Sequence, residues 1–102
     1  MKPSPLSDSE VSSRLFALKS WQKQNGEIVR TFEFGDFRGS LTFVNKVGEL
    51  AEKAGHHPDI DIRYNKVRLA LVSHDAGGLT TKDFDLAGEI DGVQAPGQVS
   101  NP

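Results

Sequence analysis

The chain has three histidines, His56, His57 and His74, and they are its strongest candidates for chemistry. An imidazole exchanges protons close to neutral pH, so paired histidines are typical of general acid–base catalysis. Glu52 lies four residues before His56, which on a helix is the same face one turn earlier. A carboxylate there is able to orient the His56 ring. Residues 52–58 therefore predict a proton-transfer site.

The two neighbouring histidines lie where a helical pattern ends and a strand pattern begins. Gly55 is typical of a helix end because it adopts a left-handed conformation without steric cost. Pro58 disfavours helical dihedrals at the residue before it, which predicts an extended His57. The pair is thus expected on a short, stiff junction.

Two other interpretations of the histidines stay open. His56 at a helix end is also a favourable partner for the negative end of the helix dipole. A metal-dependent hydrolase or sensor would use the histidines together with Asp75. The chain has no cysteine and no His-x-x-x-His spacing, and adjacent histidines rarely reach one ion together, which disfavours a metal site.

Length and composition limit the functions that the chain can have. At 102 residues it is one domain, and an apolar share of only 36% favours oligomerisation. The basic residues are scattered and the net charge is −2, which argues against direct nucleic-acid binding. With no disulfide framework, signal peptide or membrane-length apolar run, we expect a soluble, cytoplasmic protein without a membrane partner.

Helix and turn signals divide the chain into elements. Ser7 with Glu10, and Thr80 with Asp83, have capping-box spacing and predict helices that begin after residues 7 and 80, the second ending near 93. The same spacing gives Asp83 a purely structural interpretation beside a role at the site. A third helix is expected from an N-cap at Asp36 to about residue 54.

Two hairpins are predicted between these helices. Asn25-Gly26 is a strong hairpin signal linking strands over 21–24 and 27–34, with Trp21 expected in the core. A second turn at Asn65-Lys66 would pair Tyr64 with Val67. Continued along the strands, that register would bring His57 opposite His74. The loop over 73–78 then carries two glycines that would let the backbone approach a ligand.

The resulting order is helix, strand, strand, helix, strand, strand, helix. It predicts an α+β domain, with a four-stranded antiparallel sheet and three helices packed on one face. We assign residues 1–5 to a flexible arm, 6–93 to the domain and 94–102 to a disordered tail.

With these elements in place, the chain resembles the pterin-4a-carbinolamine dehydratases, also called dimerization cofactors of a liver homeodomain transcription factor. The family signature has a charged residue, three others, and then His, His or Asn, and Pro. An aromatic residue, a His or Trp and an Asp follow. The matching residues are Glu52, His56, His57, Pro58, Tyr64, His74 and Asp83.

The resemblance implies dehydration of a 4a-hydroxytetrahydropterin, the carbinolamine released by aromatic amino acid hydroxylases, to quinonoid dihydropterin and water. It implies no metal and no redox cofactor, a homodimer or homotetramer, and a hydroxylase as functional partner. Relatives also act as coactivators, so a binding module remains the alternative function. The residues matching His56 and His74 are the proton-transfer pair, and His57 chiefly binds. The expected substrate-binding set is Glu52, Gly55, His57, Pro58, Ser73, Asp75 and Asp83.

Overall fold

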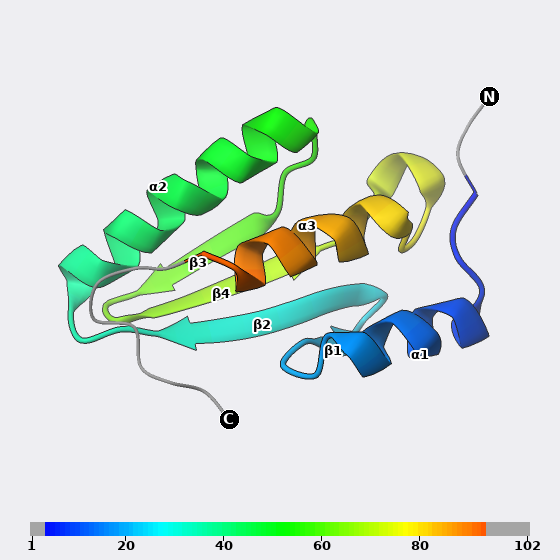
Figure 1. Ribbon diagram of the computed structural model, residues 1–102, viewed down its shortest axis with the longest axis horizontal. Helices are drawn as coiled ribbons and strands as arrows, with labels where there is room; N and C mark the ends of the chain where they lie inside the picture. The colour runs from blue at the N-terminus through cyan, green and yellow to red at the C-terminus, as the bar shows by residue number, and fades with distance from the viewer. Residues whose placement is uncertain (1–3, 94–102) are drawn as a thin grey trace.

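The computed structural model describes residues 4–93, so the predicted tail over 94–102 and most of the predicted arm over 1–5 lie outside the described residues. The predicted order of elements is confirmed (Figure 1). The helices and strands are α1 (Asp8–Ala17), β1 (Gln22–Gln24), β2 (Glu27–Glu33), α2 (Phe37–Ala54), β3 (Asp59–Arg63), β4 (Lys66–Leu71), the 3-10 helix η1 (His74–Ala76) and α3 (Thr81–Asp91). None of the helices within 4–93 is long and apolar enough to cross a membrane.

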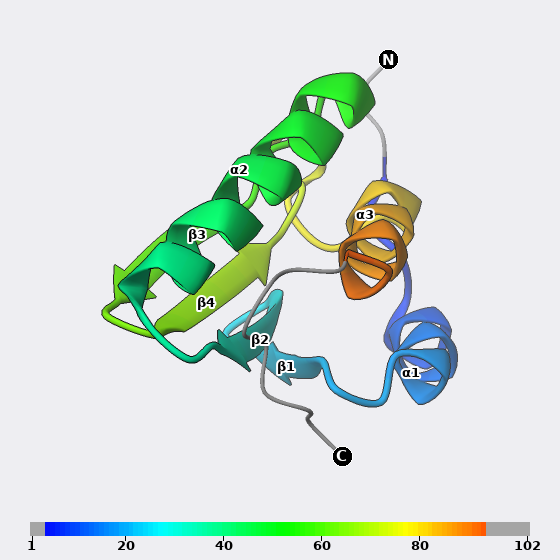
Figure 2. The same ribbon diagram turned by 60° about the vertical axis from the view of Figure 1, so that its left-hand side comes forward.

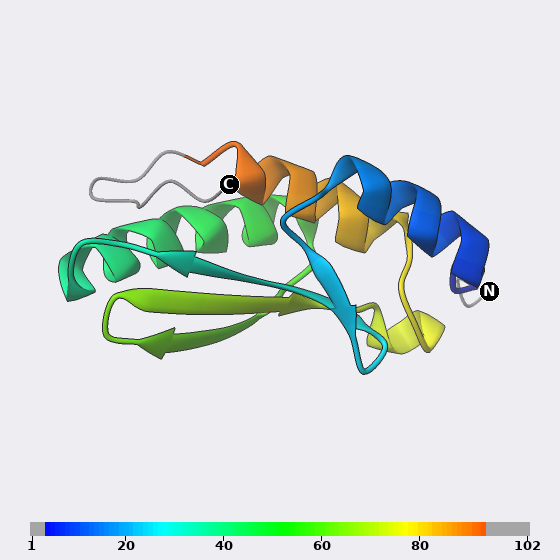
Figure 3. The same ribbon diagram turned by 90° about the horizontal axis from the view of Figure 1, so that it is seen from below.

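The four strands form one antiparallel sheet in the order β1-β2-β4-β3. Seen edge-on, α1, α2 and α3 all lie on the same side of this sheet, as the order of the elements predicts (Figure 3). Figure 2 shows α3 lying between α1 and α2. The core between sheet and helices includes the fully buried side chains of Ile28, Phe32, Phe34, Phe43, Val47, Leu69, Leu71, Leu86 and Ile90.

The predicted start and end of α2 are both confirmed. Asp36 accepts a hydrogen bond from the Gly39 backbone N–H at 2.8 Å, which is N-capping by a side chain. Gly55 ends the helix with φ +63°, the left-handed conformation that a residue with a Cβ adopts only at a steric cost. The chain therefore turns sharply just before the histidine pair.

The first hairpin forms as predicted. Asn25 and Gly26 occupy the turn with φ +51° and +80°, and Gln24 pairs with Glu27 across it. Trp21 is in the core, as expected, with 3% of its surface exposed. Its indole N–H donates to Asp91 Oδ1 at 2.8 Å, which ties the last residue of α3 to the sheet side of the molecule.

The predicted register of the second hairpin is wrong by two residues. The turn is Tyr64-Asn65 rather than Asn65-Lys66, so Ile62, not Tyr64, pairs with Val67. Asn65 exchanges two hydrogen bonds with the Phe34 backbone, accepting at 2.8 Å and donating through its side chain at 2.9 Å. These contacts with the end of β2 hold Asn65 inside the turn, while Tyr64 takes a φ of +51°.

Candidate functional site

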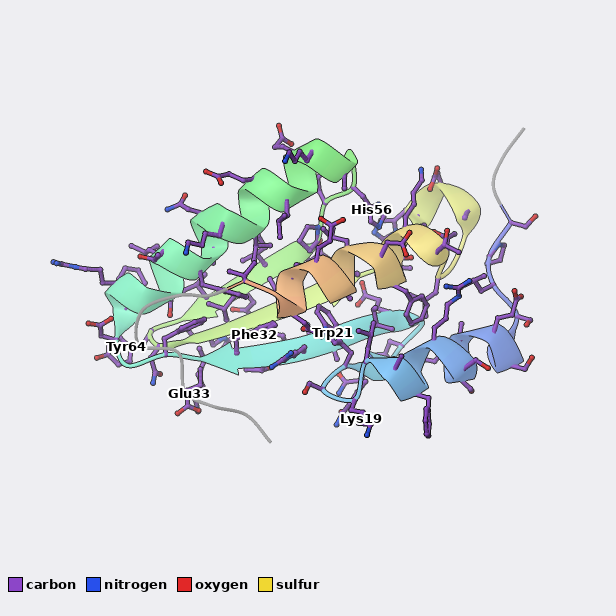
Figure 4. All side chains as sticks on the ribbon, viewed as in Figure 1. Lys19, Trp21, Phe32, Glu33, His56 and Tyr64 are labelled. Atoms are coloured by element: carbon purple, nitrogen blue, oxygen red, sulfur yellow. The ribbon has the colours of Figure 1, made fainter. Side chains whose placement is uncertain are left out.

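The first pair of functional groups joins the end of α2 to the start of α3. His56 follows the left-handed Gly55, and its Nε2 lies 2.5 Å from Oδ1 of Asp83 in the first turn of α3. The imidazole is 13% exposed and the carboxylate is fully buried. Figure 4 shows His56 between these two helices. A fully buried carboxylate thus holds an imidazole that keeps a small exposed fraction.

Asp83 is the centre of a buried polar network. Its Oδ2 accepts hydrogen bonds from Ser73 Oγ at 3.0 Å and from the Thr80 backbone N–H at 2.9 Å. Ser73 Oγ and Thr80 Oγ1 are 2.8 Å apart, and both residues are buried. The predicted capping box of α3 is confirmed, and the same carboxylate also reaches His56, so the structural and site interpretations of Asp83 apply together.

The second pair corrects the predicted partner of Glu52. Its Oε2 lies 2.5 Å from Nε2 of His57, not against His56. The prediction assumed helical spacing through residue 56, but α2 ends at Ala54, and the left-handed Gly55 turns the next residues out of the helix. This pair is open to solvent, with the His57 ring 62% and the Glu52 side chain 78% exposed.

The predicted route that brings His74 to the other histidines is also wrong. In the observed register Asp59 pairs with Ala70, and continuing it by two residues sets His57 level with Val72. β4 ends at Leu71, and His74 begins the 3-10 helix η1, which the sequence predicted only as loop. His74 is exposed and lines a cavity of about 350 Å³ with Asn25, Gly26, Glu27, Val72, Gly77 and Gly78.

The predicted site residues fall into three groups. Ser73, Asp83 and His56 are joined by hydrogen bonds, Glu52 and His57 form the exposed pair, and His74 and Asp75 lie in η1. Gly55 and the half-buried Pro58 bracket the histidine pair in the chain and hold its backbone. Within 4–93, no three histidine, aspartate or glutamate side chains gather as metal ligands do.

Sequence reasoning missed Thr80 as part of the site. Its capping-box spacing with Asp83 was visible, but that spacing predicts only a helix N-terminus. The contact between its hydroxyl and Ser73 joins residues on two segments, the loop after β4 and the start of α3. A tertiary contact of this kind has no local sequence signal.

Comparisons with known proteins show the family to which the chain is similar. The family model described as pterin 4 alpha carbinolamine dehydratase matches residues 4–93. A relative from Acidobacterium capsulatum that carries the family name is 59% identical over 88 residues, covering 86% of this chain and 96% of the relative. Another, from Chloroflexus aurantiacus, is 57% identical over 88 residues, covering 86% of this chain and 95% of the relative.

Solved structures extend the comparison to three dimensions. The crystal structure of a transcriptional coactivator/pterin dehydratase from Brucella melitensis superposes with a TM-score of 0.82 at 34% identity, covering 86% of this chain and 96% of that one. A pterin dehydratase-like protein, identified as a RuBisCO assembly factor in the α-carboxysome, shares the fold with a TM-score of 0.57 at 22% identity, covering 70% and 82%. The class is that of the small α+β hydro-lyases. The chain belongs to the pterin-4a-carbinolamine dehydratase family.

Proposed function

We propose that this protein dehydrates 4a-hydroxytetrahydropterins to quinonoid dihydropterin and water by histidine acid–base catalysis. The family match over residues 4–93 supports the reaction. The observation that carries the mechanism is the short contact between His56 and the buried carboxylate of Asp83. Such a contact fixes the orientation and the proton position of an imidazole, as proton transfer requires.

The chemistry needs one acid and one base. The acid protonates the leaving 4a-hydroxyl as the C4a–O bond breaks, and the N5 lone pair forms the C4a=N5 bond. The base then accepts the N5 proton, so the balance is loss of one water without oxidation or reduction. Two imidazoles supply both groups, each contributing on the order of 10²-fold or more.

The three histidines divide this work. We assign proton transfer to His56 and His74, which lie on separate segments and would face the substrate from two sides. His57 is exposed and its partner is a solvated carboxylate, so we assign it chiefly to binding the pterin. Glu52 and Asp75 would contribute polar contacts to the bound substrate.

Turnover is the direct test of the reaction. Purified protein is given freshly generated 4a-hydroxytetrahydropterin, and loss of the carbinolamine absorbance is followed with and without a chelator. We expect turnover above the spontaneous rate that the chelator leaves unchanged. Activity lost to the chelator and restored by zinc would contradict the proposed mechanism and support the metal-dependent alternative. A protein that binds partners but never accelerates water loss would support the coactivator-like alternative.

We further propose that the activity supports tetrahydropterin recycling in the cytoplasm, beside an aromatic amino acid hydroxylase that releases the substrate. The test is genetic: deletion of the gene should slow hydroxylase-dependent tyrosine formation while exogenous tetrahydropterin relieves the defect. Unchanged hydroxylation in the deletion strain would contradict this role.

A homodimer or homotetramer is proposed from the exposed apolar side chains of α2 and β3. Leu41 and Ile60 are 41% and 39% exposed, and β3 is an edge strand of the sheet. Half-buried Val44 lines a groove between these elements, whereas Val47 is fully buried. Light scattering at tens of micromolar should give at least a dimer. Val44→Lys should shift the mass toward monomer without unfolding, and a monomeric wild-type protein would contradict the proposal.

A further inference from the structure

The two nitrogens of the His56 ring have different surroundings. Nε2 is held by Asp83 at 2.5 Å, while Nδ1 has no hydrogen-bond partner among residues 4–93. A neutral imidazole carries a single ring proton, and the hydrogen bond made by one nitrogen decides where that proton resides. An ionised carboxylate only accepts, so this contact requires the proton to lie on Nε2.

The hydrogen bonds behind Asp83 show that its Oδ2 acts as an acceptor. Oδ2 already takes two donors, the Ser73 hydroxyl and the Thr80 backbone N–H. Because Ser73 has one hydroxyl proton and gives it to Asp83, the Thr80 hydroxyl must donate to Ser73 Oγ. The donors thus form a directed chain that ends at the carboxylate and fixes its rotation, with Oδ1 aimed at His56.

Ser73 and Thr80 act from behind the site. Ser73 is 2% exposed and Thr80 is 8% exposed, so both side chains are almost entirely buried. Their hydroxyl groups make their hydrogen bonds within the network around Asp83. This burial separates them from Glu52 and His57, whose side chains are open to solvent.

We propose that Ser73 and Thr80 are positioning residues that act through Asp83 to hold His56 as its Nε2–H tautomer, leaving Nδ1 as the atom that exchanges a proton with the pterin. The second half of this proposal rests on the proposed function, and the first half does not. In the base step the N5–H bond breaks and Nδ1 gains the proton. The imidazolium formed then carries a proton on each nitrogen, and its charge faces the Asp83 carboxylate.

The tautomer is measured directly by long-range ¹H–¹⁵N correlation on protein labelled with ¹⁵N-histidine. Three histidines make assignment by single substitution practicable. We expect neutral His56 in the wild-type protein to show the Nε2–H pattern. In Ser73→Ala and Thr80→Val we expect signals of the Nδ1–H form, because the carboxylate loses its fixed rotation. His57 should keep its pattern in both variants, which makes it the internal control. A wild-type His56 in the Nδ1–H form would overturn the proposal.

Kinetics separate positioning from simple structural support. Ser73→Ala should lower kcat roughly tenfold, a small part of the acid–base contribution, while KM changes less than about twofold. Ser73→Thr keeps the hydroxyl and should restore both kcat and the wild-type spectrum. Circular dichroism checks that each variant is folded. If Ser73→Ala does not fold, Thr80→Val takes its place in the kinetic test. A Ser73→Ala protein with unchanged spectrum and kcat would refute the network's role. The expected tautomer shifts in a protein without pterin turnover would support the network and refute the proposed function.

Discussion

The N-termini of α1 and α3 are built from one device in two environments. Before α1, the Ser7 backbone N–H donates to Glu10 at 3.0 Å, and before α3 the Thr80 backbone N–H donates to Asp83 at 2.9 Å. Glu10 is exposed, whereas Asp83 is fully buried. The same capping box therefore begins one helix in solvent and begins the other beside a histidine.

Glu10 and Asp83 occupy the same position in the same motif, and they differ in burial. The charge of Glu10 is solvated and needs no further partner. The Asp83 carboxylate has lost its water and takes hydrogen bonds from Ser73, Thr80 and His56 in exchange. A capping residue becomes available to a site when the helix end that it caps is packed against the elements that carry the other functional groups.

The largest expected effect is a loss of stability when the buried capping carboxylate, Asp83, is removed. Asp83→Ala leaves the buried Ser73 and Thr80 donors and the partly buried His56 ring without their acceptor, so we expect the free energy of unfolding to fall by roughly 3 kcal/mol or more. Glu10→Ala removes an exposed acceptor whose donor can bind water instead, and its effect should be far smaller. Urea unfolding of both variants measures the difference. Similar losses in the two variants would show that burial does not separate the caps.

The next prediction concerns catalysis and compares the two histidines beside these carboxylates. His56→Ala should lower kcat on the order of 10²-fold because it removes the proton carrier that Asp83 holds. His57→Ala should act mainly on KM. Steady-state kinetics on a pterin carbinolamine separates the two. If His57→Ala instead abolishes kcat and His56→Ala spares it, the assignment of roles is reversed.

His74→Ala should resemble His56→Ala, and the double variant tests whether the two residues act as a unit. When an acid and a base act as a pair, substituting both lowers kcat by less than the product of the two single effects. We therefore expect the double variant to be only slightly slower than the slower single variant. Fully multiplicative losses in kcat would show that the two imidazoles act in independent steps.

A smaller effect is expected at the exposed pair. Glu52→Gln removes the partner of His57, but both side chains are largely solvated, so the interaction is weak and screened by salt. We expect KM to rise by less than about threefold at low ionic strength and the difference to shrink in 0.5 M salt, with kcat unchanged. A salt-independent loss in kcat would mean that Glu52 acts on His56 after all.

Most of the fold was accessible from local signals. Ser7, Asp36, Asn25-Gly26 and Gly55 mark helix ends and a turn by their own conformational preferences, and all four are confirmed. Such preferences act within a few residues, so they survive without knowledge of the partner element. The candidate histidines were likewise found by residue type and position alone.

The rest depended on contacts between elements. The hairpin turn shifted to Tyr64-Asn65 because Phe34, at the end of another strand, binds Asn65. The partners of Glu52 and His56 depended on how the chain leaves Gly55 and on where α3 packs. Sequence spacing gives candidates for such pairs, but the packing of distant segments decides among them.

The smallest expected effect is on the pH dependence of stability at the exposed capping residue, Glu10. The hydrogen bond from the Ser7 backbone N–H, and to a lesser extent the one from the Ser7 side chain, lowers the pKa of Glu10 below its ordinary value of 4.5. A carboxyl whose pKa is lower in the folded state stabilises the fold above its unfolded pKa and loses that contribution as the pH falls through the folded value. Glu10→Gln should therefore be slightly less stable than wild type at pH 7, and the difference should shrink as the pH falls below 4.5 and through the lowered pKa of the folded state, as thermal melts at matched ionic strength measure. A difference that persists or grows in acid would show that Glu10 stabilises α1 by packing rather than by its charge.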